Sequence, residues 1–317
     1  MTKVSPSDWK DKRVLVTGGA GFLGSHLVET LVSRGARVTV LDCLDGPPGL
    51  KGVNGKIQYL KADVTVWTPG EDEKFDFIFH LAAFAFPRAA QENPDQAFRL
   101  NVTATVHMLE VARKISVKKF IFPSAGLLYT SPPQYLPIDE KHPIDPSAGV
   151  YATTKRIGEL LCDDYRKNYG VPCLTFRLFN TYGPRQSADY LVASFFRQGL
   201  SKGSLTILND RVRRDFTFVG DMVEALLKGA ETDYTGGPIN LGSGVEHSIG
   251  EVARKIADLL KIEKVECLNQ KVFGAERHFS SNRLAREILN WQPSVSLEEG
   301  LRLTCESFKE QFVLTQP

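Results

Sequence analysis

The 317-residue sequence lacks several features that would direct it to particular classes of protein. It contains no apolar run long enough to cross a bilayer, and the stretch from Met1 to Lys10 lacks the apolar core of a signal peptide. Its 39 basic and 37 acidic residues almost balance, and no basic patch or charge run indicates a nucleic-acid partner. We therefore expect a protein that works without a membrane and without nucleic acid.

Cysteine is scarce as well. The five cysteines, at positions 43, 162, 173, 267 and 305, are odd in number and show no spacing typical of metal ligands. We expect reduced, largely structural thiols in a cytoplasmic protein that has no metal site. The sequence has no internal repeat and no low-complexity segment, and its length fits one large domain or two modest ones.

What the sequence does contain, near its start, is a glycine-rich turn behind a short apolar strand. Residues 13–18 predict a buried parallel strand, and the following glycines fit the spacing Gly18-x-x-Gly21-x-x-Gly24. Glycines in such a turn allow a sharp bend, a close approach of backbone to a pyrophosphate, and tight packing of helix on strand. A helix predicted over 22–34 would point its free N–H groups at the phosphates. This order of strand, turn and helix predicts a dinucleotide site.

The next predicted strand, residues 37–42, ends in Asp42, eighteen residues after Gly24. An acidic side chain in this place accepts hydrogen bonds from the ribose hydroxyls of NAD. The same charge would repel the 2′-phosphate of NADP, so we expect NAD as the cofactor. The alternative for Asp42 is a solvated acid at the end of a strand.

Strands and helices alternate through the first part of the chain. Further strand-like runs lie at 57–62, 75–80, 119–122 and 173–179, with helical patterns at 94–114 and 151–169. This alternation predicts an α/β fold, a doubly wound parallel sheet of the Rossmann type.

After about Tyr182 the pattern becomes mainly helical, with short strands at 205–208 and 238–241. We therefore expect an NAD-binding domain over 1–182 and a smaller, mixed substrate lobe over 183–317. No polar linker divides the two, so the chain is expected to cross between them.

Tyr151 and Lys155, in the run Tyr-Ala-Thr-Thr-Lys, lie four residues apart on a predicted helix and share one face. An ammonium group beside a phenol favours the phenolate, so the tyrosine can act as a base near neutral pH. Alone, such a pair is typical of a half-exposed helix face. With a dinucleotide-binding turn upstream, it predicts a catalytic acid/base.

These residues belong to a series of motifs that run along nearly the whole chain in order. They are Thr17-Gly-Gly-Ala-Gly-Phe-Leu-Gly24, Ala62-Asp-Val64, His80-Leu-Ala-Ala83, Asn101-Val-Thr-Ala-Thr105, Tyr151-Ala-Thr-Thr-Lys155, Arg177-Leu-Phe-Asn-Thr-Tyr-Gly-Pro184 and Arg214-Asp-Phe-Thr-Phe-Val219. With them the chain resembles the extended short-chain dehydrogenase/reductases, in the NAD-dependent nucleotide-sugar epimerase/dehydratase group. The closing stretch from Trp291 to Leu301 also looks like that family.

The resemblance implies roles for individual residues. Tyr151 would be the acid/base, Lys155 would bind the nicotinamide ribose and lower the tyrosine pKa, and Asn180 and Arg214 would hold the sugar diphosphate. An arginine suits that task because its planar fork can bind phosphate through two hydrogen bonds. The expected cofactor-binding residues are Gly18, Gly21, Phe22, Leu23, Gly24, Asp42, Asp63, Val64, Leu81, Ala82, Ala83, Asn101, Tyr151 and Lys155.

Structural alternatives stand beside three of these roles. Arg214 could form an ion pair with Asp215, Asn180 could hold a turn, and Asp63 could cap a strand end.

The chain departs from the family's pattern at the serine motif. With Tyr129 as the anchor of the register, Ala125 stands where the family has a catalytic hydroxyl, and Ser124 lies one residue early. Neighbours on a strand point to opposite faces, so Ser124 would reach the site only through a bulge or shift. We expect Ser124 to substitute in catalysis and substrate binding, and the alternative is a hydroxyl satisfied by the backbone.

Other departures from the family's pattern limit which reactions and which types of enzyme we expect. The Asp-Glu pair that 4,6-dehydratases use is replaced by Gly126 and Leu127, which argues against dehydration. In Lys271-Val-Phe-Gly-Ala-Glu276 the arginine of the family's Arg-Pro-Gly-Asp is missing, and Lys271 or Arg277 could replace it. Ala85 lies in a neighbourhood where some galactose epimerases carry a lysine, so close identity with those enzymes is not supported.

The resemblance implies an NAD-dependent nucleotide-sugar epimerase that acts at C4 through a 4-keto intermediate. Two alternatives stay open: a nucleotide-sugar ketoreductase or dehydrogenase that exchanges its cofactor each turnover, and a non-catalytic member that only binds the dinucleotide. A homodimer is expected through helices 94–114 and 151–169, an isologous two-fold arrangement. Its apolar contacts could come from Val102, Val106, Leu109 and Leu160, or these residues could face the sheet.

Overall fold

The computed structural model of the chain describes residues 9–45, 48–145, 148–271 and 274–315. Its contacts divide the chain into two units, each formed by three separate stretches. The first unit contains Met1–Leu128, Pro146–Arg177 and Ala225–Ile239. The second unit contains Tyr129–Asp145, Leu178–Glu224 and Asn240–Pro317. The chain therefore passes repeatedly from one unit to the other.

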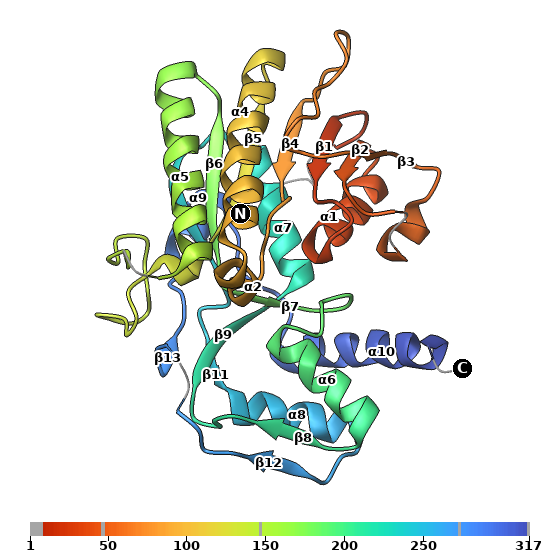
Figure 1. Cartoon of the computed structure of the whole chain (residues 1–317), viewed down its shortest axis with the longest axis vertical. Helices are drawn as coiled ribbons and strands as arrows, with labels where there is room; N and C mark the ends of the chain where they lie inside the picture. The colour runs from red at the N-terminus through yellow and green to blue at the C-terminus, as the bar shows by residue number, and fades with distance from the viewer. Residues whose placement is uncertain (1–8, 46–47, 146–147, 272–273, 316–317) are drawn as a thin grey trace. The chain divides into compact units, whose positions relative to one another are not determined.

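The first unit is built on a seven-stranded sheet with the strand order β10-β6-β5-β4-β1-β2-β3 (Figure 1). The strands are β1 (Arg13–Thr17), β2 (Arg37–Asp42), β3 (Ile57–Lys61), β4 (Phe77–His80), β5 (Lys119–Ala125), β6 (Cys173–Leu178) and β10 (Gly236–Leu241). The pairs β1–β2, β1–β4, β2–β3 and β4–β5 are parallel. All of β5 is buried, as are nearly all of β1 and β2, because a parallel sheet is covered on both faces.

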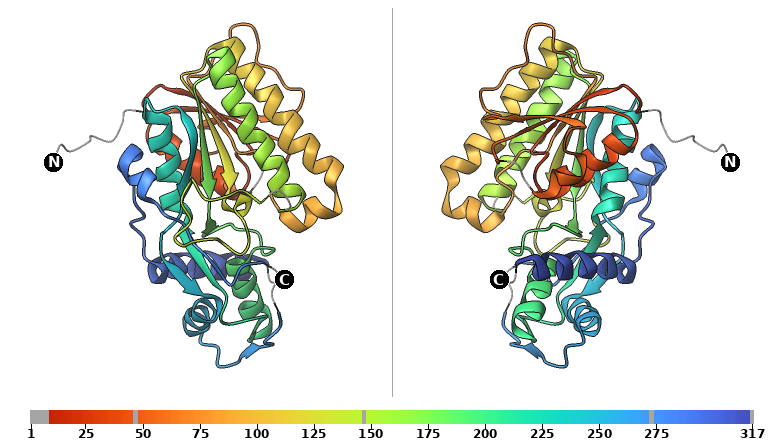
Figure 2. Two further views of the ribbon diagram at one scale, coloured as in Figure 1. Left: turned by 90° about the vertical axis from the view of Figure 1, so that its left-hand side faces the viewer. Right: turned by 90° about the vertical axis from the view of Figure 1, so that its right-hand side faces the viewer.

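Helices cover the two faces of this sheet. Figure 2 shows α4 (Ala104–Ile115) and α5 (Val150–Tyr169) on one face, and α1 (Phe22–Ser33) and α7 (Val219–Glu231) on the other. Short helices complete the connections: η1 (Pro48–Val53), α2 (Pro87–Glu92), α3 (Pro94–Phe98) and η3 (Gly126–Leu128). The apolar core under α4 and α5 includes Met108, Leu109, Phe120, Phe122 and Cys162. Leu109 therefore faces the sheet and contributes no exposed contact.

The helix predicted over 94–114 forms, but it is interrupted. Between α3 and α4 lies a π-helical turn, η2 (Arg99–Thr103), in which Asn101 is buried. The hydroxyl of Thr105 donates to the main-chain carbonyl of Asn101, 2.8 Å away. Single π-turns of this kind often mark functional positions. The side chain of Asn101 forms hydrogen bonds with Phe84 and Thr154.

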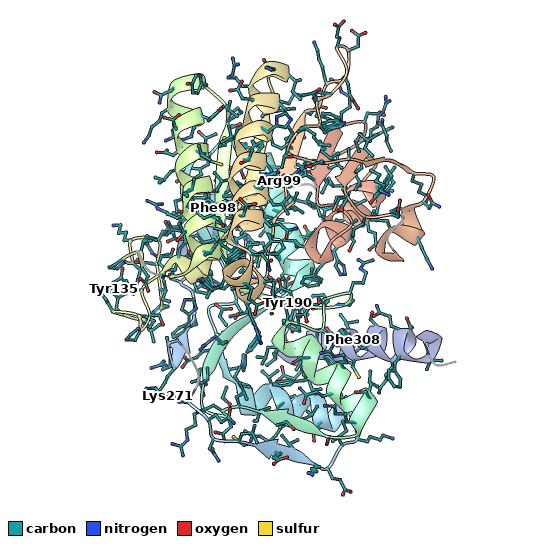
Figure 3. The ribbon with its side chains drawn as sticks, viewed as in Figure 1. Phe98, Arg99, Tyr135, Tyr190, Lys271 and Phe308 are labelled. Carbon is teal, nitrogen blue, oxygen red and sulfur yellow. The ribbon has the colours of Figure 1, made fainter. Side chains whose placement is uncertain are left out.

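The second unit contains a four-stranded sheet, a two-stranded sheet and four helices. The four-stranded sheet has the order β11-β9-β13, with β7 also paired to β9. Its strands are β7 (Asn180–Tyr182), β9 (Arg213–Phe218), β11 (Glu246–Ser248) and β13 (Arg277–His278). The other elements are β8 (Leu205–Ile207), β12 (Val265–Cys267), α6 (Leu191–Lys202), α8 (Ile249–Leu260), α9 (Arg283–Leu289) and α10 (Leu297–Thr315). Phe308 of α10 (labelled in Figure 3) stacks on Phe196 of α6, with ring centroids 5.4 Å apart.

The fold class predicted from the sequence is confirmed: strands alternate with helices, and the first six predicted strands form the sheet. One assignment was wrong. The strand predicted at 238–241 was placed with the C-terminal lobe, but β10 pairs beside β6 at the edge of the seven-stranded sheet. Strand patterns carry no information about which distant strand will be the partner, so this pairing could not be read from local sequence.

Candidate active site

The glycine-rich turn has the geometry that a dinucleotide requires. Gly18 has a φ of +67°, a conformation that side chains rarely adopt, and its N–H donates to the carbonyl of Leu41, 2.9 Å away. A Cβ on Gly24 would lie 2.2 Å from the carbonyl oxygen of Gly18, so only glycine lets α1 approach the turn this closely. Gly21 precedes the first residue of α1, and no acidic side chain lies in the first helical turn. The N–H groups of Phe22 and Leu23 therefore begin a helix whose positive end suits a pyrophosphate.

Asp42 lies at the carboxyl end of β2, with 9% of its surface exposed. One carboxylate oxygen accepts a hydrogen bond from the N–H of Ala20 in the glycine turn, 2.9 Å away, and the other accepts from the N–H of Leu44, 3.2 Å away. Burial and the carboxylates of Asp42 and Asp45, with Cys43, raise the pKa of Tyr59 to about 12. The surroundings of Asp42 are thus acidic, which suits ribose hydroxyls better than a 2′-phosphate.

Asp63 follows β3, and its carboxylate is already engaged. One oxygen accepts from the N–H and the hydroxyl of Thr65, at 2.9 and 2.7 Å, and the other pairs with Arg99 of η2 (labelled in Figure 3). These hydrogen bonds, chiefly those from Thr65, hold the pKa of Asp63 below its usual range. The neighbouring Val64 is buried in the core. The role of Asp63 in binding the cofactor stays a prediction.

The loop after β4 is fixed from two sides. The N–H of Leu81 donates to the carbonyl of Thr17, and the N–H of Ala82 donates to the hydroxyl of Thr17, 3.2 Å away. Farther along, Asn101 clamps the backbone of Phe84: Oδ1 accepts from its N–H at 2.7 Å, and Nδ2 donates to its carbonyl at 3.2 Å. The predicted cofactor-lining segment, Leu81 to Ala83, therefore runs beside the glycine turn.

Tyr151 and Lys155 lie in the first turns of α5, which begins after Gly149 with a φ of +90°. Lys155 is only 5% exposed; its ammonium donates to the carbonyl of Pro123, 2.8 Å away, and lies 5.0 Å from the ring centre of Phe122. Burial lowers the pKa of Lys155 to about 8, against the opposing influence of Cys162 and Glu159. Lys155 is therefore protonated at neutral pH and loses its charge as the pH rises through about 8.

Ser124 lies on the face of β5 that α5 covers, and it is 3% exposed. Its Oγ lies close enough to Glu159 to help lower the pKa of that carboxyl, but it makes no hydrogen bond of normal geometry. Glu159 is bound by the guanidinium of Arg177 at 2.7 and 2.8 Å and by Arg156 at 2.7 Å. Burial acts to raise the pKa of Glu159, and these cations overcome it. Glu159 lies eight residues beyond Tyr151, about 12 Å along the helix, so the proximity of Ser124 to Glu159 favours a structural role for this hydroxyl. No main-chain group among the described residues bonds to its Oγ, so a hydroxyl satisfied by the backbone, the alternative from the sequence, is not observed.

The second unit carries the two residues expected to hold a sugar diphosphate. Arg214 is half-buried, and this burial lowers the pKa of its guanidinium. Within the described residues, the guanidinium donates to the main-chain carbonyls of Arg213 and Glu276, at 2.8 and 3.4 Å. Among the residues that the structure describes, no carboxylate pairs with it. Asn180 donates from Nδ2 to the carbonyl of Asp215, 3.0 Å away. In β7 and β9, Asn180 is opposite Phe216, so Asn180 and Arg214 share one face of this sheet.

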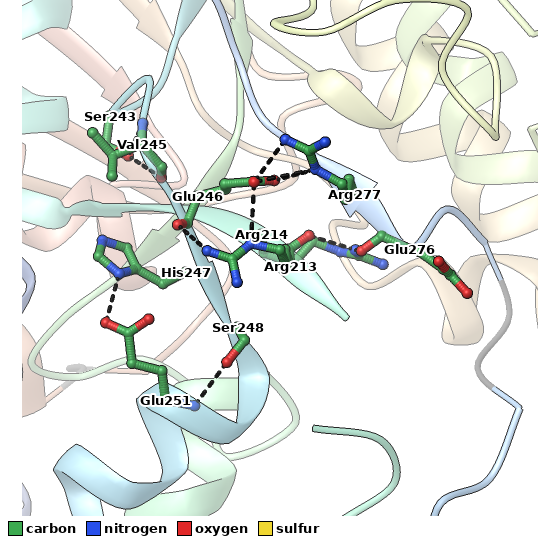
Figure 4. Close-up of polar contacts among 10 residues, drawn as sticks. All are labelled: Arg213, Arg214, Ser243, Val245, Glu246, His247, Ser248, Glu251, Glu276 and Arg277. Atoms are coloured by element: carbon green, nitrogen blue, oxygen red, sulfur yellow. Dashed lines mark hydrogen bonds and ion pairs between the residues drawn. The ribbon is translucent and has the colours of Figure 1, made fainter. Parts of the chain in front are cut away.

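The carboxylate of Glu246, near Arg214, is bound to two other arginines (Figure 4). Glu246 binds Arg213 at 3.1 Å and Arg277 at 2.8 Å, so both neighbouring arginines share this one carboxylate. The carboxylate of Asp215, fully buried, accepts hydrogen bonds from Ser243, Gly244 and Ser280. The ion pair of Arg214 with Asp215, an alternative from the sequence, is therefore not formed.

The missing second arginine has no clear replacement among the described residues. In the stretch Lys271 to Glu276, Val272 and Phe273 lie outside the described residues. Lys271 is exposed, and the guanidinium of Arg277 is held by Glu246. Of the two candidate replacements, Arg277 is thus already engaged.

Neither a metal-binding group nor a membrane-spanning helix is found among the described residues. In the described parts of the chain, no group of three or more His, Cys, Asp or Glu side chains could hold a metal ion. No helix in the same residues is both long and apolar enough to cross a membrane.

Sequence reasoning missed the side chains that hold the site in place, namely Thr17, His80, Thr105, Thr154 and Glu159. The only signal for the four residues other than Glu159 was membership in the quoted motifs, and Glu159 lies in none of them. His80, for example, opens the motif from which only Leu81 to Ala83 were selected.

Comparison with known proteins agrees with this geometry. Residues 14–242 match the "NAD dependent epimerase/dehydratase family". The chain is similar to the UDP-glucose 4-epimerase of Mycolicibacterium smegmatis, with 34% identity over 94% of this chain and 99% of that one. It is similar to UDP-glucuronic acid decarboxylase 4 of Arabidopsis thaliana, with 33% identity over 94% of this chain and 69% of the relative.

Among solved structures, the fold is similar to the UDP-N-acetylglucosamine 4-epimerase of Methanobrevibacter ruminantium, determined in complex with UDP-N-acetylmuramic acid. The TM-score is 0.89 at 28% identity, covering 95% of this chain and 99% of the other. On these comparisons, and with the glycine turn and the Tyr151–Lys155 helix in place, the chain belongs to the NAD dependent epimerase/dehydratase family.

Proposed function

We propose that the chain is an NAD-dependent nucleotide-sugar epimerase that inverts C4 of a UDP-sugar through a 4-keto intermediate. The observation that carries the proposal is the buried ammonium of Lys155, fixed to the carbonyl of Pro123 one helical turn from Tyr151. The UDP group is proposed because relatives and structural neighbours are named for UDP-sugars.

The residues of the first unit fit NAD. The turn at Gly18 and Gly24 leaves room only for backbone, the helix start at Phe22 and Leu23 offers N–H groups, and Asp42 provides an acceptor for ribose hydroxyls. When bound, the nicotinamide accepts a hydride from C4 and returns it. Asn101 and the segment Leu81 to Ala83 would line its binding region.

Tyr151 supplies the proton chemistry. As the phenolate, favoured by the charge of Lys155, it accepts the proton of the C4 hydroxyl while the C4 hydride leaves. After the 4-keto sugar turns, the other face of C4 would receive the hydride from the bound cofactor, and Tyr151 would return the proton to the C4 oxygen. The sequence of steps is redox-neutral, so the cofactor should stay bound through turnover.

Arg214 and Asn180 are proposed to hold the diphosphate. A guanidinium that has no carboxylate partner among the described residues, on the same face as Asn180, is suited to an anion. Residues Gly126 and Leu127 offer no acid or base for elimination, which supports epimerisation over dehydration.

A second candidate is decarboxylation, which the Arabidopsis relative favours. In a UDP-uronic acid, a ketone at C4 makes the C6 carboxylate a β-keto acid, which can lose CO₂. The same first step would thus give a different product.

We also propose a cytoplasmic homodimer. All five cysteines are free, consistent with a reducing compartment, and Leu160 on the outer side of α5 is 53% exposed. Light scattering that shows only monomer at micromolar concentration would contradict the dimer.

The test is a screen of UDP-, GDP-, dTDP- and CDP-sugars by thermal shift, followed by NMR of the products. Ligand binding to the native state raises the melting temperature, so the correct nucleotide should stand out. The proposal expects a C4 epimer from a UDP-sugar with no added cofactor. Release of CO₂ from a UDP-uronic acid would establish the second candidate, and stoichiometric consumption of NAD(P)H would establish a reductase. Tight NAD binding with no turnover of any sugar nucleotide would indicate a non-catalytic member.

A further inference from the structure

His80 is a buried side chain of the first unit that the proposed reaction does not use. It ends β4, is 1% exposed, and its ring packs against Phe120 and Phe122. Nδ1 lies 2.8 Å from the hydroxyl of Thr17, and Nε2 lies 3.2 Å from the hydroxyl of Thr105. In the part of the chain that the structure describes, the ring has no carboxylate partner.

The neighbouring hydrogen bonds determine which nitrogen carries the proton. The hydroxyl of Thr105 donates to the carbonyl of Asn101, so toward His80 it can only accept. Nε2 must therefore be the N–H, which leaves Nδ1 as the acceptor. Thr17 in turn donates its hydroxyl proton to Nδ1 and accepts from the N–H of Ala82.

A second set of hydrogen bonds starts at Asn101 and reaches the catalytic helix. Nδ2 of Asn101 donates to the hydroxyl of Thr154, 2.9 Å away, and that hydroxyl donates to the carbonyl of Tyr151, 2.8 Å away. Each hydroxyl in the two sets accepts one hydrogen bond and donates one. The sets meet at Asn101, whose carbonyl ends the first and whose side chain begins the second.

We propose that His80, held as the neutral Nε2–H tautomer, is a positioning residue that joins the glycine turn and the loop at Ala82 to the helix bearing Tyr151 and Lys155. The path runs through Thr17, His80, Thr105, Asn101 and Thr154, from the residues expected to hold NAD to those expected to move the proton. A neutral imidazole is required because Nε2 must donate a hydrogen bond while Nδ1 must accept one.

The surroundings keep the ring neutral. Burial, with a smaller effect from the charge of Lys155, lowers the pKa of His80 to about 3. A buried imidazolium would also have to donate from both nitrogens, which would force Thr17 to turn its proton away and would weaken its bond with Ala82. The network therefore has one proton arrangement across the working pH range.

The first test removes the central link without changing the shape of the side chain. The inference rests on the proposed function for its kinetic consequences, so cofactor release is measured separately from turnover. Thr105→Val should release NAD about tenfold faster and lower kcat about tenfold, with the KM for the sugar nucleotide within about twofold, because one buried hydrogen bond is worth roughly a factor of ten. Thr105→Ser, which keeps the hydroxyl, should restore both values.

The matched control is Thr39→Val, at a buried threonine of β2 in the first unit, whose hydroxyl donates to Gln58 outside this path. It should leave NAD release and kcat within about twofold. If Thr39→Val and Thr105→Val change NAD release equally, the role of the network is only structural and the inference is wrong. An enzyme inactive on every sugar nucleotide would defeat the proposed function, while NAD release would still decide this inference.

The second test reads the tautomer of His80 directly in the unaltered protein. In the full-length protein with ¹⁵N-labelled histidine, two-bond ¹⁵N–¹H spectra should show the resonance of His80, assigned by its loss in His80→Gln, as the Nε2–H tautomer from pH 5 to 9. A resonance that titrates in this range, or one from the Nδ1–H tautomer, would overturn the inference.

Discussion

The two units of the molecule hold their functional residues in different ways. In the first, the glycine turn is a short contiguous stretch. Asp42 accepts a hydrogen bond from the N–H of Ala20 in this turn, and Thr17, at the start of the turn, accepts one from the N–H of Ala82. In the second, Arg214 lies in the middle strand of a sheet whose partners, β11 and β13, lie more than thirty and sixty residues farther along the chain. The glycine turn is thus specified by local sequence, and the surroundings of Arg214 by long-range strand register.

The difference also appears in the charges. Lys155, in the first unit, is buried and fixed by a carbonyl, which suits a fixed electrostatic task beside Tyr151. Arg214, in the second, has no carboxylate among its described partners, while Arg213 and Arg277 share the carboxylate of Glu246. We infer that the first unit is built to hold a resident cofactor, and the second keeps one cation for an incoming anion.

The largest expected effect isolates the proton chemistry in the first unit. Tyr151→Phe should lower kcat by a factor on the order of 10²–10⁴, because only the acid/base hydroxyl is removed. NAD should remain bound, as measured by absorbance of the cofactor released on denaturation. Tyr169→Phe, an exposed position on the same helix, is the control and should be unaffected. Near-normal turnover of Tyr151→Phe would show that the assigned mechanism is wrong.

The next prediction distinguishes UDP binding, proposed for the second unit, from NAD binding, proposed for the first. Arg214→Gln should raise the Kd for UDP by about 10- to 100-fold, the range expected for a charge-assisted hydrogen bond to phosphate, and leave NAD binding unchanged. Isothermal titration calorimetry with each ligand measures both.

The control for this change is Arg277→Gln. Because Glu246 already holds that guanidinium, UDP affinity should change by no more than about twofold. A large loss with Arg277→Gln would instead identify Arg277 as the replacement for the missing second arginine.

A smaller effect is expected at Asp42. Asp42→Ala should weaken NAD binding about tenfold and reduce discrimination against NADP, because the acceptor for the ribose hydroxyls and the repulsive charge are lost together. Fluorescence titration with NADH and NADPH provides the measurement. Asp45→Ala, an exposed acid paired with Lys61, serves as the comparison. Unchanged affinity for both cofactors would place the ribose acceptor elsewhere.

The smallest effect concerns Ser124. We expect Ser124→Ala to lower the melting temperature and to keep kcat within about twofold, because the hydroxyl lies beside Glu159. If the hydroxyl instead serves catalysis, the same variant should slow turnover about tenfold. Ala125→Ser is the complementary variant, and it should raise kcat if the site lacks a hydroxyl. A marked loss of kcat in Ser124→Ala would restore the catalytic role predicted from the sequence.

Much of the first unit could be predicted from the sequence because its signals are local. The apolar run before Gly18, the glycine spacing and the acid at the end of β2 each lie within a few residues of the feature they specify. The π-turn at Asn101 escaped prediction, because it is stabilised by hydrogen bonds to Phe84 and Thr154 that no helical periodicity reveals.

In the second unit, motifs identified Asn180 and Arg214 but not their surroundings. The pairing of Glu246 with Arg213 and Arg277 depends on the register of β11, β9 and β13, which is not visible in any one segment. The same reason explains why the sequence pattern assigns the strand at 238–241 to the C-terminal lobe, whereas β10 pairs with β6.

The central claim is that a hydride leaves C4 of the sugar and returns to the same carbon within one active site. The most direct test is turnover of a UDP-sugar deuterated at C4, without added cofactor, followed by NMR of the product. The account predicts a C4 epimer that retains its deuterium at C4, with none released to water. Loss of the deuterium to solvent, or a product with unchanged configuration at C4, would contradict it.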